Sequence, residues 1–344
     1  MKTKPHLLSL THAELKQALI SKGFKPFLSD QIFNWLYKKY TTDITKMRNI
    51  SAANQALLMA QFETDLFKQI QIIKSKDGQT AKYIFTLTDD LVIEAVLLQE
   101  KNYQTLCLSS QAGCPLKCKF CLTGKMGFKR NLSVQEIVGQ VLTMFQNNQN
   151  PVNLVFMGMG EPLLNLENVI QAIAVLEDKH GLDYGKRRIT VSTAGIIQSI
   201  DYLIQHNITL NLAFSVGHPD PIKRTILMSA ETKNPIISIS RLLHRYLTLH
   251  NRKLTLEYTL LDTINDNDIA ITELSNLAHY LDAKINLINL NPHPDIPFKP
   301  VSKQKLSKIC QTLLKSGNTV TIRQSKGQDI GAACGQLAPK AIAA

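Results

Sequence analysis

The stretch Gly113-Cys114-Pro115-Leu116-Lys117-Cys118-Lys119-Phe120-Cys121 brings three cysteines into eight residues. Cysteines this close together cannot staple a fold, and clustered cysteines in a reducing compartment indicate metal binding or catalysis. A cubane iron–sulfur cluster normally takes four thiolates. Three thiolates therefore predict an iron–sulfur centre in which one iron stays open to another ligand.

A structural zinc site is the alternative for the same cysteines. Such a site uses four Cys or His ligands, usually arranged as two pairs. No second pair follows the array, and no histidine lies between His12 and His180. Cys107, seven residues upstream, could supply a fourth thiolate, so the residues alone leave zinc open.

Length and composition limit the class of protein. A chain of 344 residues with 44% hydrophobic residues is expected to form about two globular domains. It has no apolar run long enough to cross a bilayer, and its first residues are too interrupted for a signal peptide. We therefore expect a cytoplasmic protein, with no membrane partner and no disulfide framework.

The chain is strongly basic, with a formal net charge of +12. Basic residues concentrate in residues 1–60, around the cysteine array and beyond residue 296. This distribution favours a polyanionic partner, RNA or DNA, over a merely solvated surface.

The first hundred residues predict helices followed by strands. Thr11 and Glu14 form a capping-box pattern, and a second helix begins near Ser29 with Trp35 on its apolar face, where we expect core packing rather than base stacking. From residue 70 to 99 the pattern is β-rich, with a hairpin turn at residues 76–79. Glu94 interrupts the last apolar run, and the pattern alone favours a solvated carboxylate on an edge strand.

From residue 104 onward, strands alternate with helices. This alternation predicts a parallel sheet with helical crossovers, either a barrel or an open sheet. Ligands of such folds lie at the carboxyl ends of the strands. The cysteine array and several polar residues follow successive predicted strands, so the sequence predicts one active-site rim.

The array after the first strand of an α/β domain resembles the radical S-adenosylmethionine (SAM) superfamily. Longer strings resemble the RlmN/Cfr family of RNA adenine methyltransferases within it: CLSSQAGCPLKCKFCLTGKMGF, MGMGEPLLN, RRITVSTAGI, INLINLNP and DIGAACGQL. The resemblance implies an α/β fold with a partial (β/α) barrel. It further implies a helical RNA-binding accessory domain (1–65), a β-rich hairpin extension (66–103), the catalytic domain (104–337) and a short tail (338–344).

The resemblance also implies roles for individual residues. A 4Fe–4S cluster is expected on Cys114, Cys118 and Cys121, with two SAM molecules consumed per turnover. Cys334 is the expected S-methylcysteine, Cys107 the resolving cysteine that forms a transient disulfide with it, and Glu94 the proton acceptor, which reverses the solvated reading. The expected SAM contacts are Gly160, Glu161, Ser192, Ser215 and Asn291.

The chemistry explains why two cysteines outside the cluster are needed. The amidine carbon of adenine is electrophilic, so it cannot attack the sulfonium methyl of SAM, whereas a thiolate can. Cys334 would accept the methyl group and Cys107 would later release the product. The remaining cysteine, Cys310, lies at a core-like helix position and is interpreted as packing.

The expected substrate is 23S rRNA and/or tRNA, methylated on carbon 2 of an adenosine by a monomeric enzyme that takes electrons from a flavodoxin or ferredoxin. The alternatives are methylation of carbon 8 and a non-catalytic iron–sulfur RNA-binding protein. Two segments depart from the family. Ser215-Val216-Gly217-His218-Pro219 replaces the usual SLHAP, and Met228-Ser229-Ala230-Glu231-Thr232-Lys233 replaces MPINK. These departures predict a divergent member with a narrowed or altered substrate.

Overall fold

A single ten-stranded sheet organises the chain in the computed structural model, which describes residues 4–100, 103–147 and 153–338. Its order is β1-β2-β3-β4-β7-β8-β9-β10-β11-β12. Neighbouring strands from β4 to β12 pair in parallel, whereas β1 to β4 pair antiparallel. The sheet is open, with β1 and β12 at its edges, so the expected partial barrel is confirmed.

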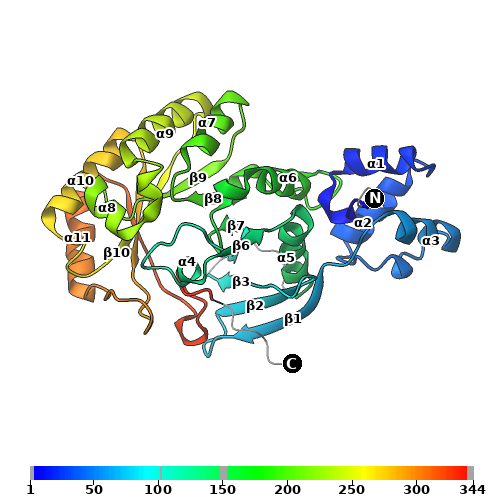
Figure 1. The fold of residues 1–344 in the computed structure, drawn as a ribbon, viewed down its shortest axis with the longest axis horizontal. Helices are drawn as coiled ribbons and strands as arrows, with labels where there is room; N and C mark the ends of the chain where they lie inside the picture. Colours follow the sequence, from blue (N-terminus) through cyan, green and yellow to red (C-terminus); the bar gives the residue numbers. More distant parts are fainter. Residues whose placement is uncertain (1–3, 101–102, 148–152, 339–344) are drawn as a thin grey trace.

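The parallel strands and the helices between them fall where the alternating pattern predicted them, except for the helix over Pro221–Leu227, which was not predicted (Figure 1). The strands are β4 (Gln104–Cys107), β7 (Asn153–Phe156), β8 (Ile189–Thr193), β9 (Asn211–Ser215), β10 (Thr255–Leu260), β11 (Lys284–Asn289) and β12 (Val320–Arg323). The helices are α5 (Val134–Asn147), α6 (Leu166–Glu177), α7 (Ile197–Gln205), α8 (Pro221–Leu227), α9 (Ile236–His250), α10 (Asp268–Tyr280) and α11 (Lys303–Lys315).

The N-terminal helices form a lobe beside α5 and α6 (Figure 1). They are α1 (His12–Ser21), α2 (Leu28–Tyr37) and α3 (Ala52–Gln61). The predicted capping box is present, because the Thr11 hydroxyl accepts from the Glu14 N–H and the Glu14 carboxylate accepts from the Thr11 N–H. Trp35 packs against the core as predicted, but it is only half-buried. Its indole N–H donates to Asn49 Oδ1 at 2.5 Å, and the Lys39 ammonium lies 3.6 Å from its ring centre.

The β-rich extension is part of the main sheet. It consists of β1 (Phe67–Lys74), β2 (Thr80–Leu87) and β3 (Val92–Gln99), and the turn between β1 and β2 matches the predicted hairpin. β3 pairs with β2 on one side and with β4 on the other. Glu94, opposite Ile84 in this register, is therefore on an interior strand and is 1% exposed. The interpretation as a solvated edge carboxylate is wrong.

Three short elements next to the cysteine array were not predicted. They are β5 (Gln111–Gly113), β6 (Phe128–Asn131) and α4 (Leu122–Met126), and β5 and β6 form a separate antiparallel pair. Apart from α8 and six short 3-10 helices, the pattern holds in the described residues, and Cys310 packs against the core as expected. Within the described ranges, no helix is both long and apolar enough to cross a membrane. The predicted tail lies outside these ranges beyond Ala338.

Candidate active site

The predicted site residues meet at the carboxyl edge of the parallel strands. Cys107 is the last residue of β4, Ser192 is the penultimate residue of β8 and Ser215 ends β9. Asn291 lies two residues beyond the end of β11. Because parallel strands end at a common edge, residues from distant parts of the chain share one rim, as the sequence predicted.

The cysteine array forms the loop between β5 and α4. Cys114 follows β5 directly and its N–H donates to the Gly127 carbonyl at 3.0 Å, while Cys121 caps α4. The loop turns tightly, since a Cβ on Gly124 would lie 2.9 Å from the Cys118 nitrogen. The backbone contacts therefore hold the three cysteines in one compact loop.

Burial dominates the electrostatics of this loop. It raises the pKa of the Cys114 thiol to about 12, with the neighbouring charges of Cys121 and Glu161 adding to the effect. Burial also raises the pKa of Cys118, assisted by Cys121 and Cys114. Thiolates that repel one another in a buried site need a compensating cation. An iron–sulfur cluster supplies that positive charge, so the donor set fits a three-thiolate cluster.

The segment after β7 supplies a buried carboxylate to the same rim. Glu161 is 4% exposed, and its carboxylate accepts N–H groups of Ala194 at 2.8 Å and Leu163 at 3.1 Å. Burial raises the pKa of Glu161 to about 7. Gly160, at φ +100°, lets the chain pass β5, because a Cβ there would lie 2.6 Å from the Gln111 Cβ. This carboxylate suits the ammonium group of an amino acid such as the methionine part of SAM.

The other expected SAM contacts lie on adjacent strands. The hydroxyls of Ser192 and Ser215 are 3.5 Å apart. Asn291 is already engaged, because its amide N–H donates to the Cys334 carbonyl at 3.0 Å and its oxygen accepts from Gln328 at 2.7 Å. Asn291 thus holds the loop that carries Cys334.

Cys107 and Cys334 line one small cavity of about 30 Å³, and both thiols are free. The loop of Cys334 is attached to the cysteine array. The Leu122 N–H donates to the Gly335 carbonyl at 2.8 Å, and the Thr123 hydroxyl donates to the Leu337 carbonyl at 2.7 Å. Two cysteines 227 positions apart in sequence therefore flank a single space next to the array. Cys107 therefore shares this space with Cys334.

Glu94 lies at a second, larger cavity of about 870 Å³, between the β-rich extension and helix α4. Its carboxylate contacts the Lys82 ammonium at 3.0 Å and accepts the Ala338 N–H at 3.1 Å. Burial raises the pKa of Glu94, and the charge of Lys82 opposes that effect. A buried carboxylate with a raised pKa is suited to accepting a proton.

Comparisons with known proteins agree with this geometry. Residues 108–274 match the model of the Radical SAM superfamily, and residues 5–63 match the ribosomal RNA large subunit methyltransferase N-terminal domain. The dual-specificity RNA methyltransferase RlmN of Buchnera aphidicola (subspecies Acyrthosiphon pisum) is 40% identical, over 97% of this chain and 94% of its own. A probable RlmN of Chlorobium phaeobacteroides is 37% identical over 98% and 96%. The chain belongs to the RlmN family.

A solved structure supports the same assignment at the level of the whole fold. The radical SAM methyltransferase of Sphaerobacter thermophilus superposes with a TM-score of 0.92 at 35% identity. The match covers 97% of this chain and 99% of that one. As a radical SAM protein of the RlmN family, the chain uses a 4Fe–4S cluster and SAM.

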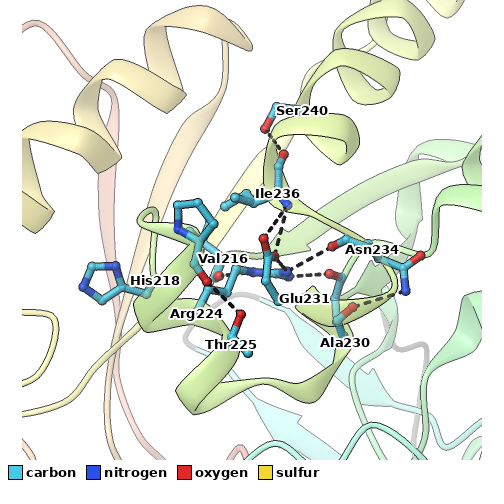
Figure 2. A network of polar contacts seen from close by, with 12 residues as sticks. Val216, His218, Arg224, Thr225, Ala230, Glu231, Asn234, Ile236 and Ser240 are labelled. Carbon is cyan, nitrogen blue, oxygen red and sulfur yellow. Dashed lines mark hydrogen bonds and ion pairs between the residues drawn. The ribbon is translucent and has the colours of Figure 1, made fainter.

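The segments that depart from the usual RlmN sequence surround a buried ion pair (Figure 2). Arg224, 0% exposed, donates to Glu231, to the Val216 carbonyl at 2.8 Å and to the Ala194 carbonyl at 2.6 Å. Both carboxylate oxygens of Glu231 accept the Ile236 N–H at 3.0 Å. The departures thus build an internal framework.

This framework bears directly on the cysteine array. The Lys119 N–H donates to the Leu227 carbonyl at 3.0 Å, and the Ser229 hydroxyl donates to the Leu116 carbonyl at 2.5 Å. His218 is fully buried, and burial lowers its pKa to about 4, so it is neutral near pH 7. Ser229, in the divergent segment, thus anchors the loop of the cysteine array.

Sequence reasoning missed three charged residues of the site: Lys82, Arg224 and Arg323. Arg323 had a usable signal, because it ends β12 and so lies at the same rim as Cys107 and Ser215. Lys82 gave no such signal in the sequence, because its contact with Glu94 depends on the pairing of β2 with β3. Arg224 lies on a helix that was not predicted.

Proposed function

We propose that this RlmN family member methylates carbon 2 of an adenosine in 23S rRNA and/or tRNA through a methyl-cysteine and a covalent protein–RNA adduct. The observation that carries the proposal is the pair Cys107 and Cys334 in one cavity beside the cysteine array. The printed names of the relatives, dual-specificity RNA methyltransferases, support the substrate class.

Cys114, Cys118 and Cys121 would hold the 4Fe–4S cluster. When bound, the cluster supplies the electron that cleaves SAM reductively to a 5′-deoxyadenosyl radical. Glu161 would bind the SAM ammonium, and Ser192 and Ser215 would line the same site. Two SAM molecules are used per turnover, one as methyl donor and one as radical source.

Cys334 would act first, as a thiolate that takes the methyl group of one SAM. Hydrogen abstraction from this S-methyl group leaves an S-methylene radical on Cys334, which adds to the adenine carbon. Glu94 then accepts the ring proton while one electron leaves the adduct. Cys107 finally attacks the sulfur of Cys334, and a disulfide forms as the methylated base departs.

The N-terminal lobe and the β-rich extension also have roles in this proposal. The helical lobe of residues 1–65 would contact RNA, since it is basic and its hollow around Trp35 is lined by Lys39, Lys46 and Arg48. The β-rich extension, residues 66–103, supplies Glu94. A flavodoxin or ferredoxin would supply electrons to a monomeric enzyme in the cytoplasm.

The test is an anaerobic assay of reconstituted protein with RNA, followed by mass spectrometry of the nucleosides. We expect 2-methyladenosine from the native chain, a trapped protein–RNA adduct from Cys107→Ala and no methylated RNA from Cys334→Ala. Methylation by Cys334→Ala would refute the mechanism. 8-Methyladenosine would move the reaction to the other carbon, and absence of SAM cleavage would leave only an RNA-binding protein.

A further inference from the structure

Arg323 lies beside the two thiols that the reaction uses outside the cluster. Its Nη2 is 3.9 Å from the Cys107 sulfur, and its Nη1 is 3.2 Å from the Met157 sulfur. The same cavity of about 30 Å³ is lined by Arg323, Cys107 and Cys334. A guanidinium directed at a buried thiol is a costly arrangement unless the thiol carries charge at some stage.

Cys107 needs such a partner. The attacking species in thiol chemistry is the thiolate, and burial raises the pKa of Cys107 to about 11, which disfavours it. Arg323 opposes that effect, and the charge of Cys334 adds to it. Lys326 also lines the cavity, but its ammonium is held by Glu100 at 2.8 Å and by the Gln99 carbonyl at 2.6 Å.

We propose that Arg323 is a positioning residue that holds Cys107 as the attacking thiolate in the step that releases the methylated RNA. The inference rests on the proposed function, because it assigns Cys107 the role of resolving thiol. In the described part of the chain, Arg323 is the cation in contact with this sulfur, and its own acidic neighbour is Glu257.

The step balances without an added oxidant. The Cys107 thiolate forms a bond to the Cys334 sulfur while the bond from that sulfur to the methylene carbon breaks. The electron pair of the broken bond goes to the methylene carbon, which takes up a proton and becomes the methyl group. The two thiols are oxidised to a disulfide as the carbon is reduced, and an external dithiol restores them for the next turnover.

The adduct itself would strengthen the role of Arg323. In the resting protein the charges of Cys334, then Cys107 and Glu257, raise the pKa of Arg323, so the two thiols share one guanidinium. Once Cys334 is a thioether it is neutral. Its repulsion of Cys107 is then gone, and the guanidinium serves the resolving thiol alone.

The test measures how fast the adduct resolves in a single turnover. Protein preincubated with SAM, with Cys334 methylation verified by mass spectrometry, is mixed with RNA and reductant, and the covalent adduct is followed on denaturing gels. We expect Arg323→Gln to form the adduct but to resolve it at least about tenfold more slowly, the change in thiolate fraction for one pKa unit. Arg323→Lys should recover part of the rate.

A pH series and two controls separate this role from a structural one. Between pH 7 and 9 the resolution rate should rise with pH in both proteins, with the Arg323→Gln line displaced downward because Cys107 ionises at higher pH. Lys326→Gln, which removes a cation from the same cavity without touching the thiol, should resolve the adduct at the native rate. Cys107→Ala should not resolve it.

The outcomes distinguish the two ideas. If Cys107→Ala accumulates no adduct, the proposed function fails. If Cys107→Ala traps the adduct but Arg323→Gln resolves it at the native rate, only the role of Arg323 fails. Should Arg323→Gln not fold, as judged by iron content and SAM cleavage, the Arg323→Lys rate decides: native speed at every pH overturns the proposal.

Discussion

The side-chain amide of Asn291 donates a hydrogen bond to the backbone carbonyl of Cys334 across 3.0 Å. This contact joins the segment after β11 to the loop that carries Cys334, the proposed methyl acceptor. We predict that Asn291→Ala lowers RNA methylation on the order of a hundredfold while 5′-deoxyadenosine continues to form, because a small displacement of a reacting group has a large effect on rate.

The ratio of 5′-deoxyadenosine to methylated nucleoside, both quantified by mass spectrometry, measures this uncoupling. Asn289→Ala is the matched control, because Asn289 ends β11, two residues before Asn291, and its side chain bonds the backbone of Val301 instead. The ratio of 5′-deoxyadenosine to methylated nucleoside in Asn289→Ala should equal that of the native protein. An equal rise in both variants would show that general loosening of β11, and not the link to Cys334, is responsible.

The proposed role of Glu94 as proton acceptor predicts a pH dependence of the reaction. Burial raises its pKa and Lys82 opposes that rise, and only the ionised carboxylate accepts a proton. The rate should therefore fall as the pH drops through the raised pKa. Lys82→Met should shift this acid limb to higher pH, because it removes the opposing charge. Glu94→Gln should lower the rate by about 10² to 10⁴.

The pH profile of single-turnover product formation tests both variants. Lys68→Met is the control, because Lys68 lies on the neighbouring strand β1 in an exposed pair with Asp90. Its profile should coincide with the native one. If the acid limb of the Lys82→Met profile moved to lower pH, Lys82 would not stabilise the charge on Glu94.

Much of the fold followed from pattern alone. The alternation of apolar strands and amphipathic helices predicted the parallel sheet. The ends of the predicted strands predicted the rim at which the site residues lie. Glu94 shows the limit. The sequence pattern of an apolar strand with one carboxylate is the same whether the strand lies at the edge or in the interior of a sheet. Only the pairing of β3 with β4 shows that this strand is an interior one. The resemblance to a family supplied what the pattern could not.

Contacts between distant residues were also hard to predict. Arg323 contacts Cys107 from 216 positions away, and although its place at the end of β12 puts it on the same rim, the sequence pattern does not show that the two side chains meet. The short strands β5 and β6 pair with each other across the segment that holds the array, and three or four residues each are too few to give a strand pattern. Trp35 was predicted in part, because it packs against the core while its indole N–H bonds Asn49 at the surface.

The buried ion pair of Arg224 and Glu231 should contribute strongly to stability (Figure 2). Their side chains are 0% and 4% exposed, so removing one charge leaves the other buried without compensation. We predict that Glu231→Gln lowers the free energy of unfolding by about 3 kcal/mol. Lys253→Gln, in an exposed pair with Asp282, should give no measurable change in the same denaturant titration.

Gly160 should be intolerant of any side chain. It has φ +100°, and an added Cβ would lie 2.8 Å from the Gln111 backbone nitrogen as well as 2.6 Å from its Cβ. Because β5 cannot yield as a flexible side chain would, Gly160→Ala must displace Glu161 next to it. We predict SAM binding on the order of tenfold weaker, equivalent to about 1.4 kcal/mol.

Calorimetric titration of the reconstituted protein with SAM measures this change. Gly23→Ala is the matched control, because Gly23 has φ +82° but no atom within 4 Å of an added Cβ. It therefore carries the backbone strain without the collision and lies far from the rim, so its affinity for SAM should remain native. Native affinity in Gly160→Ala would instead mean that the position of Glu161 does not limit SAM binding.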